Sequence, residues 1–418
     1  MDKENRCEYG KIEFEQKDKL VFNEARICFL NIFGIPNYSK TEPLVRLDFL
    51  PLDQKEYLSK EQIINALNKS QIKFNEYHRN ENNQNRYDFF IEDKQLEKWV
   101  KSIPSISNNN VPISVKAIEF TLSILKDLRI VLFYVNILLQ DTTPDDLILI
   151  QQYYSTHKKE VVEKIYTSLS GYKYREEKIY FTILSEVLNV NLKNQTPLEL
   201  IEHYPKEFYG MLTNDEGWRQ VPQKWAMERI KSYWGTRTYL LFLALGRRTI
   251  ILKFGHTEEY KRSVEYETRF KNLVYRTDSI PMVDISPSNL AGTPFEYSSI
   301  NNFILREMNN QVDLYFIKDV KVNFALLYKF WRNRDIINSK LEKLLDVNEG
   351  IELECLKNYI KEAMNIPYEY NKLKEKLPLI ESTFITRTKL YTDRFLYGFS
   401  IFNLVLALYN VYRSVFFN

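Results

Sequence analysis

Tryptophans interleaved with cations make residues 217–237 the stretch of this sequence best suited to bind a ligand. The segment reads GWRQVPQKWAMERIKSYWGTR, and an arginine pair follows it at 247–248. Indole rings stack on planar groups, and guanidinium groups pair with phosphate or carboxylate oxygens. We therefore predict a site for a small anionic or nucleotide-like ligand, formed by Trp218, Arg219, Trp225, Arg229, Trp234, Arg237 and Arg247. The alternative is an amphipathic helix whose tryptophans anchor a core beneath a solvated basic face.

Motifs for metal binding and catalysis are otherwise weak. The segments 141–146 (DTTPDD) and 213–216 (TNDE) offer the oxygen ligands that a divalent cation prefers, although both are also typical of helix caps and turns. The four histidines lie 46 or more residues apart, and the 11 glycines form no GxGxxG, GxxxxGK or GxSxG motif. The sequence therefore predicts no catalytic residue and identifies no cofactor. It leaves open whether the protein binds a divalent cation.

Composition narrows the classes of partner. The chain has 418 residues, with 44% hydrophobic and 27% charged side chains, which is enough for two or three domains with sizeable cores. A net charge of +3 gives no reason to expect a nucleic-acid polymer as a partner. The three cysteines are far apart, and the first 20 residues are too charged for a signal peptide, so we predict a cytoplasmic main body.

The most apolar part of the chain is the uncharged run from Phe395 to Tyr412, which Arg394 and Arg413 flank. As a helix, these 18 residues would rise about 27 Å, close to the roughly 30 Å of a bilayer core. One face of that helix carries small and polar residues at a spacing of three and four: Ser400, Asn403, Ala407 and Asn410. We predict a membrane helix that self-associates or lines a polar lumen, and the alternative is a buried core helix.

The surrounding elements predict an α+β fold with four regions. Residues 1–105 read as an α/β domain and 113–210 as a helical domain, in which 115–140 and 175–188 are expected to be helices. Residues 211–320 read as an α/β region with a hairpin that turns at 246–248. Residues 321–418 read as long helices, the last running from 378 to 412 as a stalk that ends in the membrane segment 395–412.

This layout resembles the CorA-like superfamily of membrane ion channels and transporters. The hairpin after Thr238, the helices after Asn323 and the final helix to Tyr412 carry the resemblance, whereas the family's Gly-Met-Asn signature does not occur. The resemblance implies an oligomeric membrane protein, and some members are nucleotide-gated effectors in antiviral defence. We therefore predict a membrane-located homo-oligomer, channel-like or an effector, gated by a ligand on its cytoplasmic body. The alternatives are a soluble or peripheral enzyme with a scattered site, and a tail-anchored scaffold.

Overall fold

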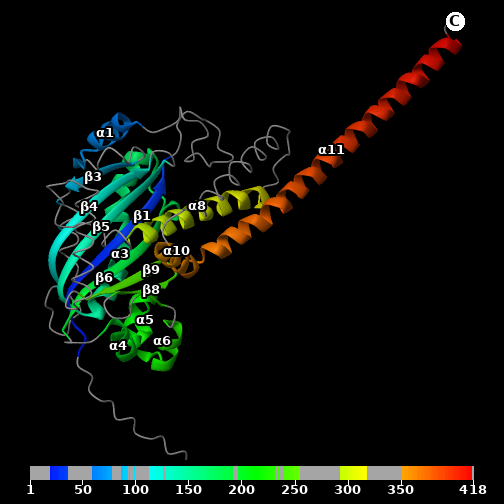
Figure 1. Cartoon of the computed structure of the whole chain (residues 1–418). Helices are drawn as coiled ribbons and strands as arrows, with labels where there is room; N and C mark the ends of the chain where they lie inside the picture. Colours follow the sequence, from blue (N-terminus) through cyan, green and yellow to red (C-terminus); the bar gives the residue numbers. More distant parts are fainter. Residues whose placement is uncertain are drawn as a thin grey trace, which may run out of the picture.

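The computed structural model describes most of the chain between residues 19 and 416. The described segments are 19–35, 59–77, 86–92, 113–125, 129–191, 196–230, 233–235, 240–254, 292–317 and 351–416, with Lys94 and Lys98. Within these segments nine strands form one sheet, in the order β2-β3-β4-β5-β1-β6-β9-β8-β7. Helices pack on both of its faces (Figure 1), so the α+β class predicted from the sequence is confirmed.

The sheet is antiparallel apart from one parallel pair among the strands described, β6 with β9. Its strands are β1 (Phe22–Gly34), β2 (Lys73–Tyr77), β3 (Arg86–Glu92), β4 (Ser114–Leu125), β5 (Ile130–Thr142), β6 (Tyr180–Val190), β7 (Tyr233–Gly235), β8 (Leu240–Leu245) and β9 (Arg248–Lys253). The hairpin predicted around residues 246–248 is confirmed as β8 and β9. Strands from three of the four predicted regions lie in this one sheet, and the domain boundaries themselves stay a prediction.

Two helices predicted for the middle of the chain, at 115–140 and 175–188, are wrong. Residues 115–140 form β4 and β5, and β6 takes up most of the helix predicted at 175–188. Alternate residues of β5 enter two different cores: Val131 and Phe133 lie on one face of the sheet, and Leu132 and Tyr134 on the other. A strand that is buried on both faces shows no alternation of polar and apolar residues, so its run of apolar residues resembles a core helix.

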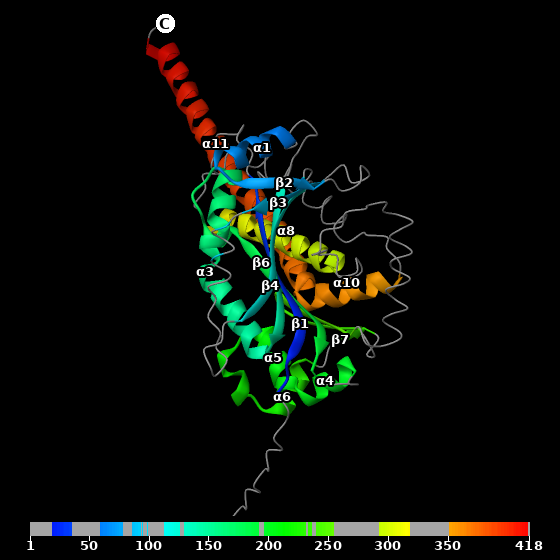
Figure 2. The ribbon, with the colours of Figure 1, turned by 90° about the vertical axis from the view of Figure 1, so that its left-hand side faces the viewer.

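Two helical layers cover the sheet, as Figure 2 shows with α3 on one side and α8 and α10 on the other. The first layer consists of α1 (Lys60–Lys69), α3 (Pro144–Ser170), α4 (Pro197–His203), α5 (Pro205–Thr213) and α6 (Gln223–Arg229). The second layer consists of α8 (Gly292–Ile317), α10 (Ile351–Ala363) and the first turns of α11 (Ile366–Phe416). The larger core lies beneath the first layer, where the ring of Phe29 stacks on Tyr154 with centroids 3.9 Å apart.

Helix α5 approaches its neighbours closely at Gly210. A β-carbon at this position would lie 2.6 Å from Trp218 Cγ and 2.9 Å from Ile148 Cδ1. Gly210→Ala is therefore expected to lower the free energy of unfolding by about 1–3 kcal/mol, because overpacking outweighs the gain in helix propensity. Urea denaturation measures this change. The matched control is Gly398→Ala in α11, where the added carbon meets nothing within 4 Å and stability should stay the same or rise.

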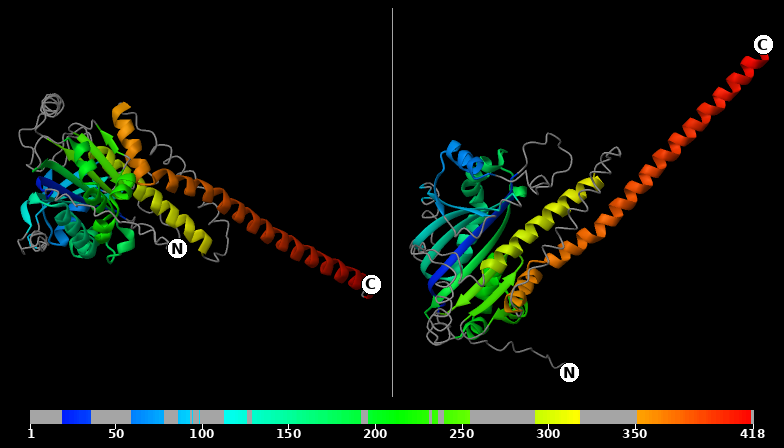
Figure 3. Two further views of the ribbon diagram at one scale, coloured as in Figure 1. Left: turned by 90° about the horizontal axis from the view of Figure 1, so that it is seen from below. Right: turned by 45° about the horizontal axis from the view of Figure 1, so that its top comes forward.

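The last helix, α11, leaves the body and extends away from it (Figures 1 and 3), and it includes the continuous helix predicted at 378–412. The predicted membrane segment is wrong: in the part of the chain that the structure describes, no helix has both the length and the apolar character needed to span a bilayer. The dense run of exposed apolar side chains described on α11 extends from Phe395 to Leu408, a rise of about 20 Å, against a bilayer core of roughly 30 Å. The prediction of a membrane location, which depended on this segment, is therefore also wrong.

Candidate functional site

The fold separates the predicted ligand-binding residues onto the two faces of the sheet. Trp218 lies in the larger core, where its ring is 6% exposed beneath α5. Trp234 of β7 packs against the smaller core on the opposite face, with its ring 5.4 Å from that of Phe242. Arg237 lies outside the described residues. The seven residues therefore do not form one site, and Trp218 serves as a core anchor.

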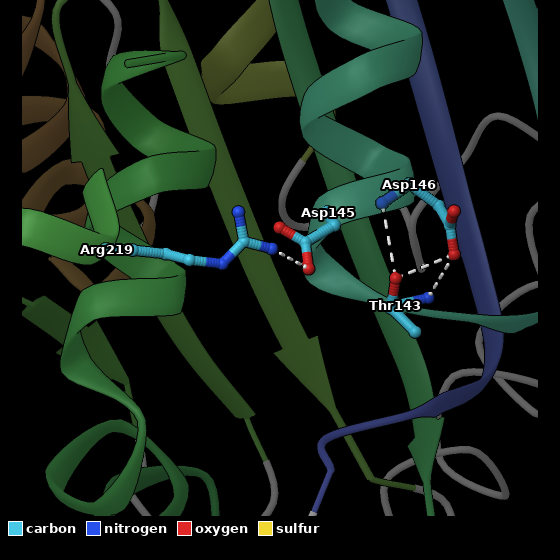
Figure 4. A network of polar contacts seen from close by, with 4 residues as sticks. All are labelled: Thr143, Asp145, Asp146 and Arg219. Atoms are coloured by element: carbon cyan, nitrogen blue, oxygen red, sulfur yellow. Dashed lines mark hydrogen bonds and ion pairs between the residues drawn. The ribbon is translucent and has the colours of Figure 1, made fainter. Parts of the chain in front are cut away.

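On the α6 side, the predicted cations rest on the tryptophans next to them. The Arg219 guanidinium lies 4.7 Å from the Trp218 ring centroid and forms an ion pair with Asp145 at 2.5 Å, which Figure 4 shows. The Arg229 guanidinium lies 5.0 Å from the ring of Trp225, which is 39% exposed. Asp145 therefore offsets part of the charge of Arg219, whereas the Arg229 guanidinium is stacked without an ion pair in the described part of the chain.

The acid-rich segments serve the ends of helices. Thr143 and Asp146 form a capping box at the start of α3 (Figure 4), in which the Asp146 carboxylate accepts hydrogen bonds from Thr143 N and Oγ1 at 2.9 and 2.7 Å. Asp215 Oδ1 accepts a hydrogen bond from Gly217 N at 2.9 Å. Among the described residues, no group of three histidine, cysteine, aspartate or glutamate side chains has the arrangement of a metal site. Asp145, Asp146 and Asp215 therefore have structural partners.

Two guanidinium groups from different elements meet at the ring of Tyr180. Arg247, in the turn between β8 and β9, lies 4.6 Å from the ring centroid, and Arg306 of α8 lies 5.4 Å from it. The distance between the two guanidinium carbons therefore cannot exceed the sum of these values. Both arginines are partly buried, and neither forms a hydrogen bond or an ion pair through its guanidinium within the described residues. Two positive charges beside one ring raise the local positive potential, which favours an anion nearby.

Tyr180 adds a polar group to this place. The residue is 4% exposed, and its hydroxyl is buried without a hydrogen-bonding partner in the described part of the chain. Burial raises the pKa of this phenol well above its ordinary value, and the charge of Arg306 opposes that shift. The hydroxyl is therefore a neutral donor at physiological pH. We call Tyr180, Arg247 and Arg306 the arginine pocket.

Sequence reasoning found one of these three residues. Arg247 was among the predicted ligand-binding residues, whereas Tyr180 and Arg306 were missed because they lie far from it in the chain. Their proximity follows from the parallel pairing of β6 with β9 and from the packing of α8 on that face of the sheet. No local motif signals such a contact. Arg219 forms an ion pair with Asp145, whereas Arg247 forms none within the described residues, and only the structure reveals this difference.

The comparisons with known proteins give no relative for this chain. No family model matches it, and searches of curated proteins and of solved structures found no match. The resemblance to the CorA-like superfamily therefore stays a prediction from layout.

Proposed function

We propose that this protein assembles with copies of itself through α11 and binds a small anion in the arginine pocket. The observation that supports assembly most strongly is the uncovered apolar stretch of α11 from Phe395 to Leu408, which we call the α11 patch. Its large apolar side chains are 48–73% exposed. They are Phe395, Leu396, Tyr397, Phe399, Ile401, Phe402, Leu404, Val405, Leu406 and Leu408. A continuous apolar surface of this size is typical of an interaction site.

A second copy of the same helix is the partner that fits the α11 patch. Ser400, Asn403 and Ala407 share one face of α11, and all three are exposed in the single chain. In a symmetric assembly of parallel helices, each copy brings the same side chain to the same level. Small residues then allow close approach, and the amides of Asn403 can hydrogen-bond to one another, which fixes the register. Burying each large apolar side chain contributes roughly 1.5–3 kcal/mol.

The arginine pocket has a direct connection to α11. Arg306 stands three residues before Asn309 on α8, and Asn309 Nδ2 donates hydrogen bonds to Glu369 O and Oε2 of α11 at 3.0 and 2.9 Å. Farther along the same two helices, Lys376 Nζ pairs with Asp313 Oδ1 at 2.5 Å. An anion that draws Arg306 toward Arg247 would therefore shift α8, whose Asn309 and Asp313 contact the first part of α11. We propose that ligand binding changes the strength of assembly by this route.

Sedimentation equilibrium of the full chain tests this function. The chain has a mass of 50.1 kDa, and we expect masses that rise to an integral multiple of that value as the concentration increases. Inorganic phosphate, used as the simplest probe of the arginine pocket, should shift the association constant by roughly fivefold or more, the lower end of ordinary allosteric coupling. A single-chain mass at all concentrations would refute assembly. An association constant unchanged by saturating phosphate would refute the coupling.

A further inference from the structure

Arg247 and Arg306 place two positive charges beside one ring, and neither charge is neutralised by contact within the described residues. Their guanidinium groups lie 4.6 and 5.4 Å from the ring centroid of Tyr180, and neither forms an ion pair there. Arg219, by contrast, pairs with Asp145 at 2.5 Å. Both arginines of the pocket are partly exposed, so an anion can reach them from solvent without an enclosed cavity. The charge of this place therefore decides which anions it favours.

Two glutamates near the arginine pocket already have partners. Glu307 follows Arg306 in α8 and pairs with Lys178 Nζ at 3.0 Å, so these two groups together add no net charge. Glu369 of α11 accepts a hydrogen bond from Asn309 Nδ2 at 2.9 Å, and within the described residues it forms no ion pair with either arginine of the pocket. Its carboxylate lowers the positive potential from a distance, whereas a bound anion would contact the guanidinium groups directly, at about 2.7–2.9 Å.

Tyr180 adds a hydrogen-bond donor to the pocket without adding charge. Its hydroxyl is buried, and burial holds the pKa of this phenol well above its ordinary value. In the described part of the chain, Arg306 and Glu369 are the charged groups that act on this hydroxyl, and they act in opposite directions. Because guanidinium groups stay protonated at physiological pH, the pocket presents two fixed positive charges and one neutral donor. A ligand that carries two negative charges matches this arrangement better than a ligand that carries one.

We propose that the arginine pocket selects dianions, and that its ligands are phosphate monoesters rather than phosphate diesters. At pH 8 a phosphate monoester carries close to two negative charges, because its second pKa is about 6, whereas a diester carries one. The attraction to two fixed cations grows in proportion to the charge of the ligand. A monoester also offers three terminal oxygens, enough to accept hydrogen bonds from both guanidinium groups at once. This inference rests on the proposed function, because it names the class of ligand for the same pocket.

Isothermal titration calorimetry on the full chain at pH 8 and constant ionic strength tests this selectivity, with methyl phosphate and dimethyl phosphate as the probes. The two ligands are nearly equal in size and differ by one negative charge. We expect methyl phosphate to bind at least tenfold more tightly than dimethyl phosphate. Equal affinity for the two would overturn the selectivity and leave the anion site of the proposed function standing. Binding of neither would overturn the anion site itself, and the selectivity with it.

Two variants locate the source of the selectivity. Arg247→Gln and Arg306→Gln each remove one cation, so each should lower the ratio of the two affinities by roughly threefold or more, measured at higher ligand concentration. Arg219→Gln, which removes a cation already paired with Asp145, is the control and should keep the wild-type ratio. Far-ultraviolet circular dichroism establishes that each variant is folded, and if one pocket variant does not fold, the other decides. An unchanged ratio in a folded pocket variant, or an equal fall in Arg219→Gln, would overturn the assignment.

Discussion

Replacing Leu404 by glutamate is expected to dissociate the assembled protein into single chains. Leu404 is 62% exposed in the single chain and lies in the α11 patch, so assembly would bury it against a copy of the same helix. The variant loses the burial of an apolar side chain and would have to bury a carboxylate in every copy. Together these effects should weaken association by roughly 100-fold or more, which sedimentation equilibrium measures directly.

Leu379→Glu is the control for this result. Leu379 is 58% exposed on the same helix but lies nearer the body, outside the α11 patch. Both variants add one negative charge to α11, so a charge effect of the helix as a whole would appear in both. We expect Leu379→Glu to associate as the wild type does. Equal loss of association in the two variants, or none in Leu404→Glu, would count against assembly through the α11 patch.

Removing either guanidinium of the arginine pocket is expected to abolish measurable anion binding at moderate concentration. Hydrogen bonds to a charged group contribute about 1.5–3 kcal/mol each, so Arg247→Ala and Arg306→Ala should each weaken phosphate binding roughly tenfold to a hundredfold. Titration calorimetry with inorganic phosphate measures the loss. Because the two arginines are partly buried and come from separate elements, each substitution leaves the other cation in place.

Arg219→Ala is the matched control for the arginine pocket. Its guanidinium is 62% exposed and already pairs with Asp145, so removing it changes the net charge by the same amount without touching the pocket. Phosphate should bind this variant with the affinity of the wild type. If Arg219→Ala weakens binding as much as Arg306→Ala does, the anion responds to net charge alone and the pocket is not its site.

Sequence patterns predicted short elements that lie next to turn or loop signals. The run RYDFFIE is β3 at the predicted residues, and the apolar strands around the turn at 246–248 form the predicted hairpin, because local turn chemistry and composition specify both. The segment 115–140 failed because the apolar residues of β5 enter two cores at once, so the pattern of that strand does not distinguish it from a buried helix. The alternation in β4, where Phe120, Leu122 and Ile124 enter the larger core, was missed.

The candidate site was predicted only in part, since it depends on contacts between distant residues. Trp218 and Arg219 have the residue types of a ligand site, yet Gly210 lets Trp218 pack into the core, and Asp145 neutralises Arg219. The sequence cannot distinguish a paired arginine from an unpaired one before the fold is known. The C-terminal run from Phe395 was interpreted as a membrane helix because apolar residues around a whole helix suit a lipid environment and a helical assembly alike.

The distance between copies of α11 tests the central claim most directly. A spin label at Ala407→Cys, with Cys7 and the exposed Cys355 replaced by serine and the buried Cys28 left in place, reports that distance by double electron–electron resonance. Packed helices have axes about 8–10 Å apart, so labels on neighbouring copies should lie within roughly 30 Å of one another. We predict a narrow distance distribution in that range, which Leu404→Glu abolishes. Full-length protein that shows only the uniform background of separate molecules would contradict the account.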